Sequence, residues 1–348
     1  MTPSLLVVTP GLLTTIQDRG RVGYQHLGVP VSGALDPVSL QAANLLVGNL
    51  ADAGALEVAC TGPTLVAEAD DIRLAIAGAN AAIDILPYAA ATSGRPVAPL
   101  QSLRLRRGEA LRIGALTGAT VLYVAIEGGF DIAPVLGSVS TDIRSGIGGW
   151  QARALVAGDR LPLRLARTSE RDEVCLEGFN VRPRPRVRVI KGPQDDHFPD
   201  REVAAFLHSE YTVGPSADRM GMRLTGRVIK HSRGFDIASD AIAPGSIQVP
   251  GNGAPIVLLA DRQTTGGYPK IATVISADLP GLARLPVGAK VAFQAVTIEE
   301  AEAAGRNHVA ELAAMQDRIV PLCRPGADIG PRLQECNLVS GFIDGAAA

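Results

Sequence analysis

Three short segments gather the polar and charged side chains of a chain that is otherwise largely apolar. They span residues 14–24, 216–224 and 261–270. The third segment follows the apolar run 255–260, which is typical of a buried strand. A strand end that presents Asp, Arg, Gln, two Thr, Tyr and Lys within ten residues predicts the rim of a binding site, because a rigid scaffold holds those side chains in place.

The chemistry of these segments centres on arginine and aspartate. An arginine offers a planar, two-pronged donor that suits a carboxylate or a phosphate, and an aspartate can orient that arginine or accept a proton. Gly266 and Gly267 would let backbone N–H groups approach an anion. The candidate catalytic residues are Asp218 and Asp261. The candidate substrate-binding residues are Arg219, Arg223, Arg262, Gln263, Thr264, Thr265, Tyr268, Lys270, Gln17, Asp18 and Arg21.

A structural interpretation competes with this functional one. Neighbouring Asp and Arg residues often form ion pairs that only hold the fold together, and the Thr-Thr-Gly-Gly stretch at 264–267 is also typical of a hairpin turn.

The sequence gives no sign of a metal site or of the common catalytic motifs. Its five histidines are scattered, at His26, His197, His208, His231 and His308, and its four cysteines form no C-x-x-C pair. It contains no P-loop, H-E-x-x-H or G-x-S-x-G motif, and no Met-Lys-Met biotin-attachment tripeptide. If this protein takes part in biotin chemistry, the biotin is therefore expected on another chain. Because the P-loop is absent, the sequence does not tell whether this chain or a partner chain would bind a nucleotide such as ATP.

Composition narrows the class of protein. The 348 residues are 47% hydrophobic and carry a formal net charge of −2, which predicts no partnership with nucleic acid or an acidic membrane surface. The start of the chain lacks the basic residues of a signal peptide, and its longest apolar run, 115–126, is too short to cross a bilayer. Sparse cysteines fit a reducing compartment. We therefore expect a cytoplasmic protein.

The elements that would position the polar segments are mostly short strands. The chain has 38 Gly and 24 Pro, an excess that favours many tight turns. Period-two alternation predicts strands over 103–113 and 186–190. Two helices are expected, one over 36–47 with Asp36 as its N-cap and one over 297–316 with a Thr297/Glu300 capping box.

The two sides of the chain resemble each other. Residues 58–62 align with 222–226, residues 117–125 with 252–260, residues 128–130 with 266–268, and residues 158–161 with 288–291, always in the same order. This order predicts a duplicated unit, although strands flanked by glycine turns can match by coincidence. A Pro- and Arg-rich stretch, 182–186, marks the boundary. We predict domains at 1–183 and 184–316, and an irregular tail at 317–348.

Several of these segments also carry a family resemblance. Residues 10–21, 28–36, 44–49, 56–58, 137–141, 191–194, 218–224, 248–250 and 261–270 resemble, in order, the sequence blocks of the urea amidolyase-related, allophanate hydrolase subunit 2 family. This family includes biotin-dependent carboxyltransferase subdomains and 5-oxoprolinase C subunits. The sequence departs from the pattern at Ser216-Ala217, where Ser-Ser is expected, and in the extra tail after about residue 317.

The resemblance implies a mainly β fold of two tandem cyclophilin-like β-barrels with a few short helices. It implies a B subunit with a similar barrel and a separate A subunit, which together open 5-oxoproline to glutamate at the expense of ATP, with Mg²⁺ required by the complex. The alternative is a carboxyltransferase component that moves carboxylate from biotin to urea or a similar amide. The lack of biotin carboxylase and biotin carrier segments favours the first branch. A second alternative is a non-catalytic regulatory binding protein.

Overall fold

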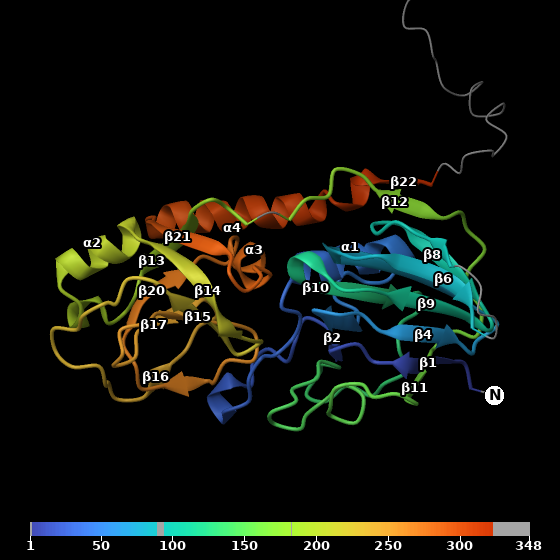
Figure 1. Cartoon of the computed structure of the whole chain (residues 1–348), viewed down its shortest axis with the longest axis horizontal. Coiled ribbons are helices and arrows are strands. Elements are labelled where there is room, and N and C mark those ends of the chain that lie inside the picture. The colour runs from blue at the N-terminus through green and yellow to red at the C-terminus, as the bar shows by residue number, and fades with distance from the viewer. Residues whose placement is uncertain (1, 89–93, 182, 323–348) are drawn as a thin grey trace, which may run out of the picture.

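The computed structural model describes residues 2–88, 94–181 and 183–322. Two β-rich halves lie side by side along the long axis of the molecule, and a long helix, α4 (Ile298–Ala313), runs along the top of the second half and ends beside the first (Figure 1). Each half has a hydrophobic core of its own. Some residues from each of the three polar segments that the sequence singled out meet where the two halves touch.

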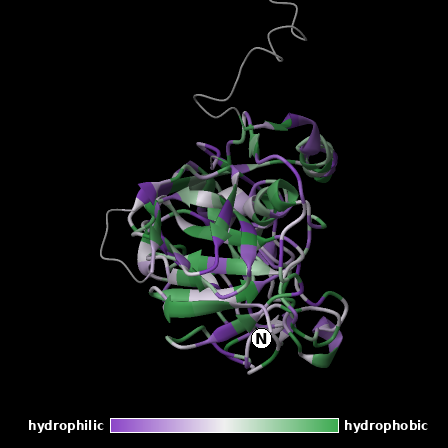
Figure 2. Cartoon of the chain, turned by 90° about the vertical axis from the view of Figure 1, so that its right-hand side faces the viewer, coloured by the Kyte–Doolittle hydropathy of each residue, from purple (hydrophilic) through white to green (hydrophobic). Residues whose placement is uncertain are grey.

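The first half consists of two antiparallel sheets that enclose one core. The six-stranded sheet has the order β11 (Arg160–Pro162), β1 (Ser4–Thr9), β4 (Thr64–Ala67), β9 (Glu109–Ile113), β6 (Ile83–Pro87) and β7 (Arg95–Pro96). The five-stranded sheet has the order β2 (Leu13–Gln17), β3 (Ala55–Ala59), β10 (Thr117–Ile126), β5 (Asp71–Asn80) and β8 (Ser102–Arg106). Hydrophobic residues dominate these strands (Figure 2). In the described part of this half the pairing does not close into one barrel, so the first predicted barrel is not confirmed.

Helix α1 (Pro37–Val47) covers the second face of the five-stranded sheet. It forms where expected, because Asp36 accepts hydrogen bonds from the backbone N–H groups of Val38 and Ser39, both at 3.1 Å, and Pro37 occupies the first turn. Its apolar side packs against β5 and β10, where Tyr123 is fully buried. A short 3-10 turn, η1 (Gln25–Leu27), lies between β2 and α1.

The second half is a closed barrel. Its strands follow the order β13 (Val187–Lys191), β20 (Lys270–Val274), β17 (Ser246–Gln248), β18 (Ile256–Leu258), β15 (Gly221–Thr225), β14 (Glu210–Ala217) and β21 (Lys290–Ala295), which pairs back onto β13 in parallel. A small ribbon of β16 (Asp240–Ala241) and β19 (Thr265–Gly266) stands beside it. The sequence did not predict α2 (Asp200–His208), α3 (Leu279–Ala283) or the short turn η2 (Asp195–His197).

The strand registers support the predicted duplication. Leu122 of β10 pairs with Val58 of β3 in the first half. The sequence alignment places Val257 opposite Leu122 and Met222 opposite Val58, and these two residues pair with each other between β18 and β15. The aligned strands therefore keep the same partner in the same antiparallel register, which chance similarity of turn sequences would not produce.

The chain returns to the first half after the barrel. Helix α4 begins with the predicted capping box of Thr297 and Glu300. After the turn η3 (Gln316–Arg318), the strand β22 (Ile319–Pro321) pairs with β12 (Val174–Leu176) of the first half. The tail predicted to be irregular from residue 317 thus begins with the end of this turn and a strand, and Ile319 of that strand packs beside Met315 against the core around α1. Residues 323–348, and Arg182 at the predicted boundary, lie outside the described residues.

Among the residues that the structure describes, no helix is long and apolar enough to cross a membrane.

Candidate functional site at the junction of the two halves

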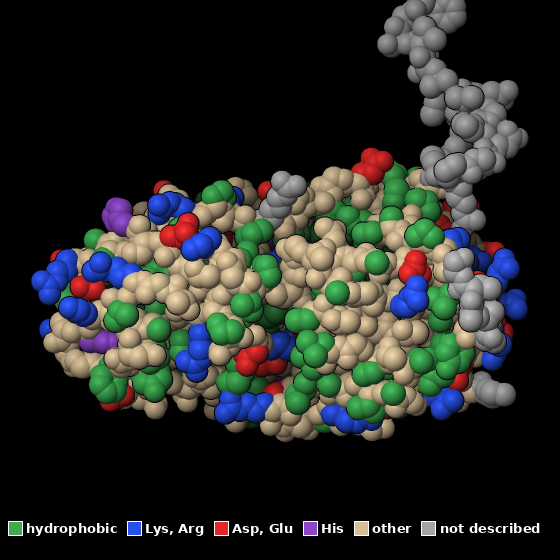
Figure 3. Space-filling model, in the orientation of Figure 1, with side chains coloured by type: hydrophobic (Ala, Val, Ile, Leu, Met, Phe, Trp, Pro, Cys, Tyr) green, Lys and Arg blue, Asp and Glu red, His purple; other side chains and the backbone are tan. Residues whose placement is uncertain are grey.

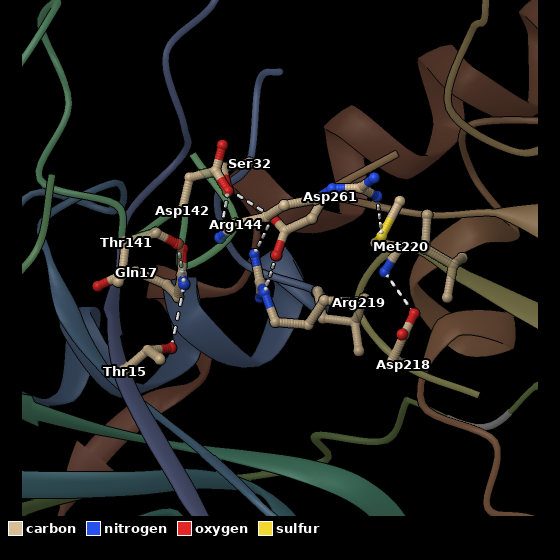
Figure 4. A network of polar contacts seen from close by, with 12 residues as sticks. Thr15, Gln17, Ser32, Thr141, Asp142, Arg144, Asp218, Arg219, Met220 and Asp261 are labelled. Atoms are coloured by element: carbon tan, nitrogen blue, oxygen red, sulfur yellow. Dashed lines mark hydrogen bonds and ion pairs between the residues drawn. The ribbon is translucent and has the colours of Figure 1, made fainter. Parts of the chain in front are cut away.

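The junction between the halves carries a dense polar network. On the surface it is a hollow where acidic and basic side chains are bordered by hydrophobic ones (Figure 3). Four segments meet there: the end of β2, the loop 138–149 of the first half, the turn 218–220 before β15, and the turn after β18 that carries Asp261 (Figure 4).

Arg219 joins the two halves through buried charge. Its Nε and Nη2 donate to the two carboxylate oxygens of Asp261, at 2.7 and 2.8 Å, and its Nη1 pairs with Glu57 of β3. Nη2 also donates to the backbone carbonyl of Gly33 at 2.6 Å. Burial alone would lower the pKa of Arg219, but the carboxylates of Glu57 and Asp261 raise it above its ordinary value. The guanidinium is therefore permanently charged and held by both halves.

Glu57 extends this network into the core of the first half. Its Oε2 accepts hydrogen bonds from the Tyr123 hydroxyl and from the backbone N–H of Leu35 at 2.8 Å. The same hydroxyl accepts from the backbone N–H of Asp36 at 2.8 Å. Burial and the nearby carboxylates of Glu57 and Asp36 raise the pKa of Tyr123 well above 10.0. Tyr123 is thus a neutral link between the start of α1 and the ion pair.

Ser32 is a strained residue in contact with Asp261. It is buried, has a φ of 57°, and its hydroxyl donates to Asp261 Oδ1. A non-glycine residue in the left-handed region costs free energy and persists only where the surroundings fix it. This strain, at the point where the halves meet, marks the network as more than a surface ion pair.

Asp18 anchors the loop 138–149. Its Oδ1 accepts from the hydroxyls of Ser138 and Ser140, and from the backbone N–H of Gly20 at 2.7 Å. Its Oδ2 accepts from the backbone N–H of Val139 at 2.7 Å. With every oxygen engaged, Asp18 positions the loop beside the end of β2.

The side chains of Gln17, Arg21 and Asp142 are buried, and each keeps at least one polar atom without a hydrogen-bond partner among the described residues. Their side chains are at most 1% exposed. No hydrogen-bond partner reaches Gln17 Oε1, Arg21 Nε and Nη1, or Asp142 Oδ2 among the described residues. Burial lowers the pKa of Arg21, against the opposing effect of Asp142, Asp18 and Asp261. Orphaned buried polar atoms are rare in folded proteins and call for an explanation.

The predicted site residues fall into two groups. Gln17, Asp18, Arg21, Arg219 and Asp261 come together at the junction. Asp218 lies at its edge, where Oδ1 accepts from the backbone N–H groups of Met220 and Gly221 and shapes the turn. That Asp218 and Asp261 are catalytic stays a prediction.

The remaining predicted residues lie on or beside the barrel. Arg223, Gln263, Thr265 and Tyr268 are exposed, and Thr264 is half-buried. Lys270 is buried, and its ammonium donates to Asp240 Oδ2 at 2.6 Å. Arg262 is buried without a carboxylate partner among the described residues, and it donates to the backbone carbonyls of Ile242 and Leu259. Burial lowers its pKa.

Sequence reasoning assigned no role to Glu57, Ser32, Tyr123 or Asp142. One signal was available for Glu57, which is a charge inside an otherwise apolar, fully paired strand. Asp142 directly follows the Ser-Val-Ser-Thr segment at 138–141, whose hydroxyls hold the loop.

The junction offers both donors and acceptors to a small polar molecule. The free N–H groups of Arg21 can bind a carbonyl or carboxylate oxygen, and Asp142 Oδ2 and Gln17 Oε1 can accept from N–H or O–H groups. No group of three His, Cys, Asp or Glu side chains suited to a metal ion occurs within residues 2–88, 94–181 and 183–322.

Comparison with known proteins identifies the family. The model of the carboxyltransferase domain, subdomains A and B, matches residues 27–295. The chain belongs to this carboxyltransferase-domain family. Its members include the 5-oxoprolinase C subunit of Escherichia coli, 39% identical over 85% of this chain and 93% of the relative, and that of Haemophilus influenzae, 36% identical over 82% and 89%. The resemblance stated from the sequence is thereby confirmed.

Larger family members share the same fold. Urea amidolyase of Saccharomyces cerevisiae is 29% identical over 85% of this chain, which spans 17% of that protein. The crystal structure of the Kluyveromyces lactis urea amidolyase superposes with a TM-score of 0.81 over 93% of this chain and 21% of the other, at 24% identity. This second likeness shows the fold alone.

Proposed function

We propose that the chain is the C subunit of an ATP-dependent 5-oxoprolinase complex, which opens 5-oxoproline to glutamate. The observation that supports this proposal is the share of each relative's length that the chain matches. The chain spans 93% and 89% of two proteins named as C subunits of 5-oxoprolinase, but only 17–18% of the urea amidolyases. A chain that matches nearly the whole length of those C subunits fits the first role better than the second.

In this proposal the chain works only in assembly. A B subunit and a separate A subunit complete the enzyme, and ATP and Mg²⁺ are requirements of the complex in the cytoplasm. The chain contributes two tandem cyclophilin-like domains, whose junction holds the substrate. Arg219, Arg223 and Arg262 are candidates for the substrate carboxylate, and Asp218 and Asp261 are candidates for proton handling.

Reconstitution tests the proposal. The chain co-expressed with its B and A partners should hydrolyse ATP in a manner dependent on 5-oxoproline and release glutamate, measured by coupled phosphate and glutamate assays. A complex lacking this chain is the control and should be inactive. Stable assembly without 5-oxoproline-dependent ATP hydrolysis would contradict the proposal.

Carboxyl transfer is the second candidate. The family model is named for a carboxyltransferase domain, and urea amidolyases share 29% identity with the chain. Under this alternative the junction would receive carboxybiotin from another protein and transfer the carboxylate to urea or a similar amide. Transfer of labelled carboxylate from carboxybiotin to urea by the purified chain would favour it.

A further inference from the structure

The junction holds a buried cation and a buried anion that do not meet. Arg21 and Asp142 are each 1% exposed, and each attracts the other electrostatically. No ion pair joins them in the described part of the chain, and both retain polar atoms without a partner, Nε and Nη1 on the arginine and Oδ2 on the aspartate. A bare arginine and a bare aspartate in a dry interior would normally close on each other.

One loop holds both side chains in place. Arg21 Nη2 donates to the backbone carbonyl of Ser140, and Asp142 Oδ1 accepts from the backbone N–H groups of Arg144 and Ser145 at 3.1 and 3.2 Å. A Cβ at Gly148 would collide with both Ser140 O and Arg21 Nη2, so glycine is required there. The orphaned atoms are therefore positioned by contacts on their other sides.

The charges restrict what can bind between them. An anion would be repelled by Asp142, and a cation by Arg21. The group that fits is neutral, with an oxygen that accepts from Arg21 and an N–H that donates to Asp142. A planar amide has both features side by side. Gln17 lies next to Asp142, because its Nε2 donates to the backbone carbonyl of Thr141 at 3.0 Å, and its free Oε1 is a second acceptor.

We propose that Arg21 and Asp142 form the subsite that recognises the amide group of the substrate, with the carbonyl oxygen on Arg21 and the N–H on Asp142 Oδ2. The identity of the substrate as a lactam rests on the proposed function, whereas recognition of an amide group does not. Gln17 Oε1 accepts the second N–H of a primary amide or a urea, which a lactam lacks.

The variant Asp142→Asn tests the direction of the hydrogen bond. Because Oδ1 is held by two backbone N–H groups, the new amide must keep its oxygen there and place its NH₂ where Oδ2 was. An acceptor becomes a donor at that one position. A lactone, in which an ester oxygen replaces the ring N–H, is the matching substrate analogue.

In the reconstituted complex, the wild type should have a KM for 5-oxoproline at least about tenfold lower than for its lactone analogue, since a buried acceptor left unpaired is costly. D142N should reverse this preference. The matched control D52N, at an exposed pair with Arg19, should keep the wild-type preference. A wild type that treats lactam and lactone alike, or a D142N variant with unchanged KM values, would overturn the inference and leave only a bound water between the two charges.

A fragment experiment separates this inference from the proposed function. Binding of 2-pyrrolidone and of γ-butyrolactone to the full chain, measured by ligand-observed NMR, should favour the lactam in the wild type and the lactone in D142N. If the chain shows this binding preference but the reconstituted complex does not turn over 5-oxoproline, the proposed function is wrong and the amide subsite is supported. Turnover of 5-oxoproline with no lactam preference in either experiment would do the reverse.

Discussion

Among the residues of the junction, we expect substitution of Arg219 to lower the stability of the protein most. Its removal would leave Glu57 and Asp261 facing each other at the junction without a counter-charge, and each of them is largely buried. Removing one partner of such a pair costs about 3–5 kcal/mol. We expect Arg219→Ala to lower the free energy of unfolding by about that amount, measured by denaturant titration of the purified chain.

The neighbouring Arg223 provides the control. It lies on β15, just after the turn that carries Arg219, but it is exposed, and its side chain has no polar partner among the described residues. Arg223→Ala should change stability by no more than about 0.5 kcal/mol. Equal losses in both variants would show that the Arg219 network carries no special stability.

Tyr123 makes a prediction about alkaline pH. Its folded-state pKa is raised well above 10.0 by burial and by Glu57 and Asp36, so the unfolded chain loses this proton first as the pH rises. The contribution of Tyr123 to stability is full below pH 10.0 and declines as the pH rises through 10.0 towards the folded-state pKa.

Tyr123→Phe should therefore lose about 1–3 kcal/mol at neutral pH, since Glu57 and the Asp36 N–H lose a partner. The gap between the variant and the wild type should shrink above pH 10, as measured by denaturant titrations from pH 7 to 11. Burial also raises the pKa of Tyr211, to about 12, but both proteins share this effect. A gap that widens at high pH would contradict the assignment.

The sequence predicted one side of the network at the residue scale but not the other. Arg219 and Asp261 stand in dense polar segments, so their types and neighbours were enough to single them out. Glu57 lies 162 residues from Arg219 along the chain. Local pattern carries no information about such a partner, because the pairing depends on how the halves dock.

At the scale of elements, local signals decided which helices could be predicted. Both α1 and α4 begin with side-chain caps, Asp36 and Thr297, that satisfy free backbone N–H groups. Helix α2 starts after Pro199 without a side-chain cap, and α3 has only five residues. These two helices are stabilised by tertiary contacts, such as the burial of Phe206 and Leu282 against the barrel, which the sequence does not display.

Helix α4 and the segment after it act as a strap across both halves. Gln41 of α1 donates to the carbonyl of Leu312 at 2.9 Å, and Met315 is 2% exposed within the core around α1. Met315→Ala should destabilise the protein by about 2–5 kcal/mol through the cavity it leaves. Val309→Ala, at a position 66% exposed on α4, should be nearly neutral. Thermal melts of the two variants would distinguish these outcomes, and equal melting temperatures would mean that the strap is not anchored.

At the scale of the whole molecule, the sequence showed the repeat, but it did not show which half closes into a barrel. The aligned segments predicted that β3 and β10 would correspond to β15 and β18, and the shared register bears this out. Whether a set of strands closes into a barrel depends on shear and on the strands at its edges. The second half closes through the parallel pair of β13 and β21, whereas the described strands of the first half remain two sheets.

The same architecture predicts that the halves unfold together. The core around α1 is completed by Met315 and Ile319, which follow the barrel in sequence, so unfolding the barrel withdraws part of the first half's core. It also removes the counter-charges of Glu57 and Asp36, supplied by Arg219 and by Arg284 at 3.4 Å. Calorimetry of the wild type should therefore show one transition whose calorimetric and van't Hoff enthalpies agree. The double variant Arg219→Ala/Met315→Ala, which weakens both connections while sparing the interior of the barrel, should broaden or split that transition. Two separate transitions in the wild type would show instead that the halves are independent domains and that the junction is too weak to couple them.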